Sequence, residues 1–198
     1  MKNDVLSFTS EDVMVRAQST PNPKAIKFIC NYPFKIDGKA TFTSAEEAKG
    51  LVLVESLFDI FSVTQVHLFK NTLTVSHNFA MEEEELVDAV EAVIVTRLPV
   101  HNPRFEGEGA TLPKPAVDRS NKSEDIQRIE EILDRTVRPG LQADGGDLDV
   151  ISFENNEVKI LYQGACGGCP SAMMGTLDAI QSILRHELGN PEIKVRPL

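Results

Sequence analysis

The pattern of apolar and polar positions predicts a mixture of strands and helices in the N-terminal half of the chain. Short apolar runs bounded by turn residues indicate strands, and apolar residues that recur with the helical period indicate helices. Ser44 and Glu47 form a capping-box pattern, which is typical of a helix start. The predicted elements are strands 13–19 and 25–30, a helix from 44 to about 59, a hairpin of strands 66–69 and 72–76, and a helix 81–98.

The C-terminal part of the chain shows a clearer pattern. Ser123 can cap a helix whose apolar residues, beginning with Ile126, fall on one face. Asn155 and Asn156 separate two apolar runs, and asparagine tolerates the backbone conformation that a tight hairpin needs. Pro170 suits the first turn of another helix. The predicted order is α-β-β-α-β: helix 124–137, strands 148–153 and 158–163, helix 170–188 and a last strand at 193–195.

Residues 99–121 separate these two parts and oppose regular structure. This stretch holds four prolines and two glycines, and its apolar residues are scattered. We expect it to be a Pro/Gly-rich linker between a domain of residues 1–98 and a domain of residues 122–198. A length of 198 residues suits two small domains. The predicted fold class is therefore α+β, with two small domains that each mix helices and strands.

The charge balance excludes several classes of partner. The formal net charge is −10 and no basic stripe is evident, so we expect binding neither to nucleic acid nor to an anionic membrane surface. No run approaches the roughly 18 apolar residues of a membrane span. Three cysteines do not make a secreted disulfide scaffold. The first residues, MKND, resemble neither a secretory signal nor a transit peptide, so we expect a bacterial cytoplasmic location rather than the mitochondrial matrix.

Cys166 and Cys169, in the segment GACGGCP of residues 164–170, are the residues with the most evident chemistry. Two residues between cysteines let both sulfurs face one point, as a metal ion or an iron–sulfur cluster requires. Glycines in the loop let the backbone approach closely. We expect the helix that begins at Pro170 to place the positive end of its dipole beside the thiols, which would lower their pKa and favour the thiolate.

Three functions use such a pair: iron–sulfur cluster binding, thiol–disulfide exchange, and zinc binding in an interaction module. Thiol exchange usually places the pair after the first strand of a β-α-β unit, whereas here it follows a predicted hairpin. A closed zinc site takes four ligands. Cys30 is far upstream and His186 has no second ligand beside it, so one chain offers only Cys166 and Cys169. Two chains supply four cysteines, which predicts a cluster or metal at a homodimer interface.

Around these cysteines the sequence resembles the Nfu family, whose C-terminal domain is named for the NifU scaffold protein. The segments that carry this resemblance are VRP at 137–139, DGGD at 144–147, LYQGACGGCPS at 161–171 and MGTL at 174–177. Other segments resemble the N-terminal domain that accompanies this module in mitochondrial-type Nfu proteins. They are TPNPK at 20–24, IKF at 26–28, ESLF at 55–58 and VTQV at 63–66.

The resemblance implies an iron–sulfur cluster scaffold or carrier rather than an enzyme. It implies that Cys166 and Cys169 ligate a [4Fe-4S] cluster, with [2Fe-2S] as the alternative, at the interface of a homodimer. The implied partners are apo iron–sulfur client proteins and upstream cluster-assembly proteins. The sequence has no Ser/His/Asp grouping, phosphate loop or dinucleotide fingerprint, which agrees with a role other than catalysis.

Overall fold

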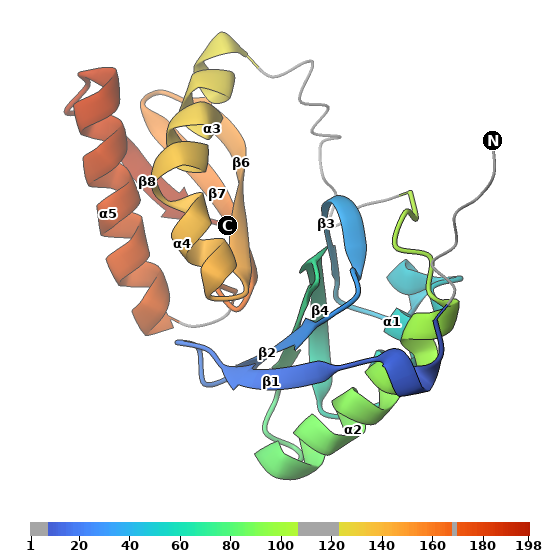
Figure 1. Cartoon of the computed structure of the whole chain (residues 1–198). Coiled ribbons are helices and arrows are strands. Elements are labelled where there is room, and N and C mark those ends of the chain that lie inside the picture. The colour runs from blue at the N-terminus through green and yellow to red at the C-terminus, as the bar shows by residue number, and fades with distance from the viewer. Residues whose placement is uncertain (1–7, 107–122, 168–169) are drawn as a thin grey trace, which may run out of the picture. The chain divides into compact units, whose positions relative to one another are not determined.

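A computed structural model describes residues 8–106, 123–167 and 170–198 (Figure 1). The chain divides into two compact units, Met1–Thr111 and Leu112–Leu198. Each unit has its own sheet and its own hydrophobic core. The predicted fold class, two small domains of mixed helix and strand, is confirmed.

The first unit is built on a five-stranded sheet in the order β1-β2-β5-β4-β3, in which all neighbours are antiparallel. Helix α2 buries Leu86, Val90 and Ile94, which recur every fourth residue and so share one face. The strands are β1 (Val15–Ser19), β2 (Ala25–Cys30), β3 (Lys35–Phe42), β4 (Val63–Lys70) and β5 (Thr72–His77). The helices are α1 (Val52–Phe58) and α2 (Glu83–Arg97), with short 3₁₀ turns at Ser10–Asp12, Glu46–Ala48 and Leu98–Val100.

Two elements of this unit differ from the sequence-based prediction. Strand β3 was not predicted, because the residues around Gly38 are polar and do not show the pattern of a buried strand. They lie at the edge of the sheet, where an irregular register leaves them exposed. The predicted helix from Ser44 is wrong in its first half, since Gly50 has a φ of +88° and separates a 3₁₀ turn from α1. The Glu47 carboxylate accepts a hydrogen bond of 2.7 Å from the Thr43 backbone N–H.

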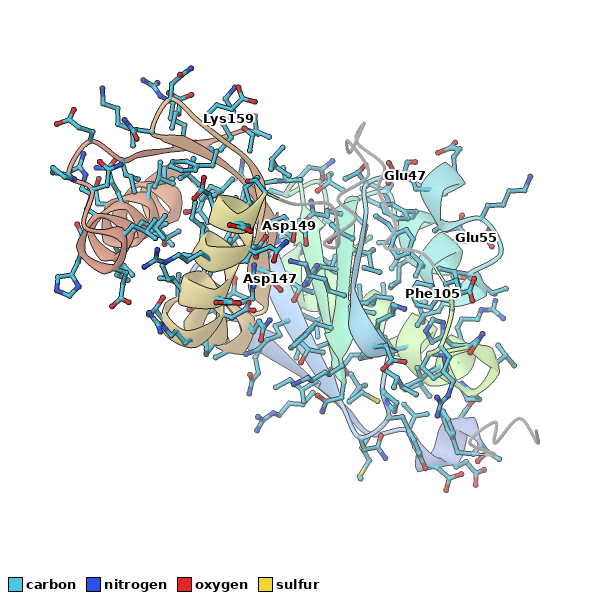
Figure 2. All side chains as sticks on the ribbon, turned by 90° about the horizontal axis from the view of Figure 1, so that it is seen from above. Glu47, Glu55, Phe105, Asp147, Asp149 and Lys159 are labelled. Atoms are coloured by element: carbon cyan, nitrogen blue, oxygen red, sulfur yellow. The ribbon has the colours of Figure 1, made fainter. Side chains whose placement is uncertain are left out.

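The first part of the expected linker, residues 99–106, instead packs onto the first unit. The Ile36 N–H donates to the Pro103 carbonyl at 3.0 Å, and the Lys35 ammonium donates to the Phe105 carbonyl at 2.7 Å. The Phe105 ring is buried in the core of this unit (labelled in Figure 2). Prolines in this stretch oppose α-helices and strands, but they do not prevent the stretch from packing on the core. Composition alone could not distinguish a packed irregular segment from an unpacked linker. Residues 107–121 of the expected linker lie outside the described residues.

The second unit has a three-stranded sheet in the order β6-β7-β8. Strands β6 and β7 form the predicted hairpin, with φ values of +51° at Asn155 and +62° at Asn156. The core-facing residues of the sheet alternate along its strands and share one core with residues of α3 and α5, so these helices cover one face. The elements are α3 (Glu124–Thr136), α4 (Arg138–Ala143), β6 (Gly146–Glu154), β7 (Glu157–Gly164), α5 (Pro170–Leu188) and β8 (Lys194–Pro197).

Helix α4 and the direction of β8 are the two features of this unit that were not predicted. The helix predicted over residues 124–137 does end at Val137, but a second helix, α4, begins at Arg138 and has Pro139 in its first turn. Strand β8 pairs with β7 in parallel, so α5 crosses over from one strand to the other. The predicted α-β-β-α-β order is therefore completed by one short additional helix.

Candidate functional site

Cys166 lies directly after strand β7, on the loop that leads to α5. Gly164, the last residue of β7, has a φ of +60° and turns the chain into this loop. The Ala165 N–H donates to the Gly145 carbonyl at 3.1 Å, and the Gly167 N–H donates to the Gly164 carbonyl at 3.0 Å. The loop is therefore fixed to the turn before β6. The Cys166 thiol is free and half-buried, and the other predicted ligand, Cys169, lies outside the described residues.

Gly146 makes the closest approach to the Cys166 side chain. A Cβ atom placed on Gly146 would lie 2.3 Å from Cys166 Sγ and 2.8 Å from the Cys166 backbone nitrogen. Real Cβ atoms do not approach so closely, so this position accepts only glycine without a shift of the loop. The pairing of Gly146 with Gly164 in the β6–β7 register brings the two segments together. The DGGD segment at residues 144–147 carries part of the family resemblance, but nothing in the sequence indicated this contact with Cys166.

The electrostatics of Cys166 contradict the expectation from the helix dipole. The pKa of the Cys166 thiol is raised to about 12. Burial is the largest cause of this rise, and the carboxylates of Asp144 and Asp147 contribute the rest. The thiol is therefore protonated at neutral pH. Deprotonation requires a positive partner that displaces the proton, and a bound metal ion is such a partner. The two aspartates that flank the glycines of the DGGD segment cause part of this effect, which the sequence did not reveal.

Arg138 forms a buried ionic network that sequence reasoning missed. Its guanidinium donates to Glu130 at 2.6 Å, to Asp147 at 3.0 Å and to the Leu148 carbonyl at 3.1 Å, and it also pairs with Asp134. Burial alone would lower the pKa of Arg138, but Glu130, Asp147 and Asp149 raise it above its ordinary value. The labelled side chains of Asp147 and Asp149 lie beside the helical segment drawn in yellow (Figure 2).

One sequence signal could have found this network. Glu130 recurs with the apolar residues Ile126, Ile129 and Leu133 at the spacing of a single helix face, so a carboxylate falls where the core is expected. A buried carboxylate needs a cationic or hydrogen-bonding partner. The network joins α3 and α4 to the start of β6, and it therefore positions the turn that contacts Cys166.

Tyr162 also lies close to the cysteine loop. Its side chain is buried in the core of the second unit, and its hydroxyl has no hydrogen-bond partner in the described structure. Burial is the main cause that raises the pKa of Tyr162 above its ordinary value, and the nearby Cys166, when it is ionised, is the second. The hydroxyl is therefore neutral, and its burial without a hydrogen bond lowers the stability of the folded unit.

The topology removes one reason that was given against thiol–disulfide exchange. Cys166 does follow the predicted β6–β7 hairpin, but β7, α5 and β8 also form a β-α-β unit, and Cys166 follows the first strand of that unit. A reactive redox cysteine, however, has a lowered pKa. The raised pKa of Cys166 opposes that function instead.

The described residues do not complete a metal site within one chain. No group of three or more His, Cys, Asp or Glu side chains in residues 8–106, 123–167 and 170–198 is arranged to hold a metal ion. In the same part of the chain, none of the helices is long and apolar enough to cross a membrane.

Both units match known domain families. Residues 15–100 match the N-terminal domain of the scaffold protein Nfu/NifU, and residues 129–196 match the NifU-like domain. The two matches follow the order along the chain that the sequence resemblance implied, and together they cover both compact units. This pair of domains defines a class of two-domain proteins with a C-terminal NifU-like module. The chain belongs to the Nfu family.

Several curated relatives are similar over most of the chain. NifU-like proteins 4 and 5, mitochondrial, of Arabidopsis thaliana are 30% and 31% identical to it, over 88% of this chain. The NFU1 iron-sulfur cluster scaffold homolog, mitochondrial, of Drosophila persimilis is 30% identical over 96% of this chain. The chain spans 62%, 64% and 66% of the length of these relatives, which is less than two thirds.

The expected bacterial cytoplasmic location is wrong. The three relatives described above carry the word mitochondrial in their names and come from a plant and a fly. The expectation relied on the composition of the first residues, MKND. Those residues are weak evidence of location when the matched relatives are longer than the chain.

Proposed function

We propose that this protein is an iron–sulfur cluster scaffold that holds its cluster through Cys166 and Cys169. The observation that carries this proposal is the packing of Gly146 against Cys166, which fixes one thiol on a glycine-rich loop. Thiolate sulfur is the ligand that iron–sulfur clusters take from proteins. The relative from Drosophila persimilis is named an iron-sulfur cluster scaffold homolog, which supports the same role here.

The cluster is cargo that two chains share. Two cysteines per chain give four ligands in a homodimer, the number that a [4Fe-4S] or [2Fe-2S] cluster takes. We favour [4Fe-4S], which the family resemblance implies. A cluster held by only two ligands from each chain can leave without unfolding either of them. Its recipients are apo iron–sulfur proteins, and its sources are upstream cluster-assembly proteins.

The protein's own residues bind and release the cluster, and they catalyse no reaction on a metabolite. The buried network of Arg138 holds the turn at Gly146 in place. That turn contacts Cys166 and so positions the cysteine loop. Loading replaces the Cys166 proton with iron. Release returns a thiol that burial keeps protonated, and this stabilises the empty state.

Anaerobic reconstitution with iron and sulfide tests the proposal. We expect wild type to become brown with about four irons per two chains, and Cys166→Ala and Cys169→Ala to lose both colour and iron. Cys30→Ala is the matched control, because Cys30 is a buried cysteine in the core of the first unit. A colourless wild type that binds zinc, or that forms a reversible disulfide between Cys166 and Cys169, contradicts the proposal.

A further inference from the structure

Two exposed phenylalanines lie on neighbouring turns of the first unit. Phe61 is 66% exposed and Phe79 is 57% exposed. Phe61 lies in the turn between α1 and β4, which the hydrogen bond from the Val63 N–H to the Ile60 carbonyl closes at 2.9 Å. Phe79 lies between β5 and α2. Neither ring contributes to the core of the unit.

Hydrogen bonds join these two turns. The Asn78 N–H donates to the Ser62 carbonyl at 3.1 Å, and the Ser62 hydroxyl donates to Asn78 Oδ1 at 3.2 Å. The same Asn78 oxygen accepts from the Ala80 N–H at 3.0 Å. Ser62 and Asn78 are the residues next to Phe61 and Phe79. The structure therefore holds two large apolar side chains on adjoining, well-fixed turns.

Both positions break the local rules that choose turn residues. Phe79 has a φ of +61°, a conformation that glycine and asparagine adopt readily and a bulky residue rarely does. Phe61 occupies a tight turn, where small and polar residues are usual. The only aromatic support for Phe79 in the described structure is an edge contact with His77, at 4.9 Å between ring centroids. Strained or misplaced residues of this kind mark functional surfaces more often than folding requirements.

The sequence next to the two rings is acidic. Within four positions of Phe61 or Phe79 the chain carries Asp59, Glu82 and Glu83, and neither Lys nor Arg. All three carboxylates are exposed, and Glu84 and Glu85 continue the exposed acidic run into the first turn of α2. A second copy of this chain would place the same carboxylates against one another in a symmetric contact, which like-charge repulsion disfavours.

We propose that Phe61 and Phe79, with the acidic rim of Asp59, Glu82 and Glu83, form a docking surface for a segment of another protein that carries large apolar side chains flanked by Lys or Arg. The two rings supply apolar anchors, which dominate binding energy when a partner covers them. The carboxylates select basic flanks and speed association. This surface does not depend on the cluster, and it assigns the first unit a role in choosing partners.

An NMR titration of the full isotope-labelled chain without iron tests this surface. The probe is a short synthetic peptide with a Leu-Phe-Leu centre flanked by Lys-Lys on both sides. Two comparison peptides carry Glu-Glu flanks or a Ser-Ser-Ser centre. We expect the first peptide to shift the amide signals around Phe61, Phe79 and Glu82, with binding that weakens in high salt. We expect both comparison peptides to bind about tenfold more weakly or not at all.

Variants separate docking from folding. Phe79→Asn suits a positive φ and removes the ring, so we expect about tenfold weaker peptide binding and a melting temperature at or above that of wild type. Val100→Asn is the matched control, because Val100 is 73% exposed and follows the far end of α2. It should bind as wild type does.

Three results overturn the proposal. One is a wild-type chain that binds none of the peptides, and another is binding whose shifts lie away from the two turns. The third is a Phe79→Asn variant that binds the peptide normally, because the ring would then not be needed for docking. A variant that melts well below wild type would also count against the proposal, because Phe79 would then serve folding.

Discussion

The contact between Gly146 and Cys166 controls the site at the scale of single residues. A Cβ at position 146 would meet Cys166 Sγ at 2.3 Å, and only a shift of the cysteine loop could relieve this clash. The loop is also bonded to the Gly145 carbonyl through the Ala165 N–H. Steric fit at one glycine therefore determines whether the thiol keeps its place.

Gly146→Ala should reduce cluster loading in anaerobic reconstitution and destabilise the second unit by about 1–3 kcal/mol, the usual cost of overpacking. The matched control is Gly140→Ala, because a Cβ on Gly140 would meet no atom within 4 Å. That control lies in helix α4 and should be neutral or stabilising by up to about 1 kcal/mol. Equal loading by both variants would contradict the role of Gly146.

Tyr162 offers a second test at this scale. Because its buried hydroxyl has no hydrogen-bond partner among the described residues, Tyr162→Phe should raise the free energy of unfolding of the cluster-free protein by about 1 kcal/mol. Urea unfolding measures this change. A loss of stability instead would mean that the hydroxyl has a partner.

At the scale of elements, Arg138 joins α3, α4 and β6, and two of its carboxylate partners, Glu130 and Asp147, are buried. Its side chain is 7% exposed, whereas that of Arg135, which pairs with Glu187 across α3 and α5, is 62% exposed. A buried carboxylate that loses its cation keeps an uncompensated charge. An exposed one is solvated by water.

Arg138→Leu should therefore destabilise the second unit by about 3–5 kcal/mol, measured by urea unfolding of the cluster-free chain. Arg135→Leu is the matched control and should cost no more than about 1 kcal/mol. Similar losses in both variants would show that burial of the Arg138 network has little energetic importance.

The segment after α2 gives a pH-dependent prediction. His101 Nε2 donates to the Phe34 carbonyl at 2.7 Å, and burial lowers the pKa of His101 below its ordinary value of 6.5. The unfolded chain therefore takes up a proton at higher pH than the folded chain. Stability is full above pH 6.5 and falls as the pH drops through the folded pKa. Burial acts in the same direction on His77.

We expect the first unit to be less stable at about pH 5.5 than at about pH 7.5, as measured by urea unfolding followed through NMR signals of that unit. His101→Gln keeps an N–H donor for Phe34 and cannot titrate, so its loss should be smaller. His186→Gln is the control and should behave as wild type. The His186 side chain is 88% exposed and belongs to the second unit. An unchanged pH dependence in His101→Gln would contradict this account.

Local patterns predicted the elements whose cause is local. The Asn155-Asn156 hairpin and the helix from Pro170 were predicted because turn chemistry and proline act over a few residues. Strand β3 and the packing of residues 99–106 depend on contacts with distant strands, and the local sequence does not contain them. The location of Cys166 on a loop before a helix was predicted, but its raised pKa depends first on burial and then on Asp144 and Asp147, which only the fold brings near it.

At the scale of the whole molecule, the protein consists of two units with separate hydrophobic cores. The second unit carries Cys166 and the network that positions it. The first unit carries the exposed Phe61 and Phe79, with which we associate partner choice. We propose that each chain offers Cys166 and Cys169, so that two chains together supply four ligands and assembly is coupled to cargo.

Native mass spectrometry of the anaerobically loaded chain tests the central claim most directly. The account predicts a species of two chains that together carry one cluster of about four irons and four sulfides, and dissociation into single chains when the iron is chelated. Cys166→Ala should remain a single chain without iron under the same conditions. A single wild-type chain that carries a complete cluster, or a dimer that persists unchanged without iron, would contradict the claim that two chains share the cluster.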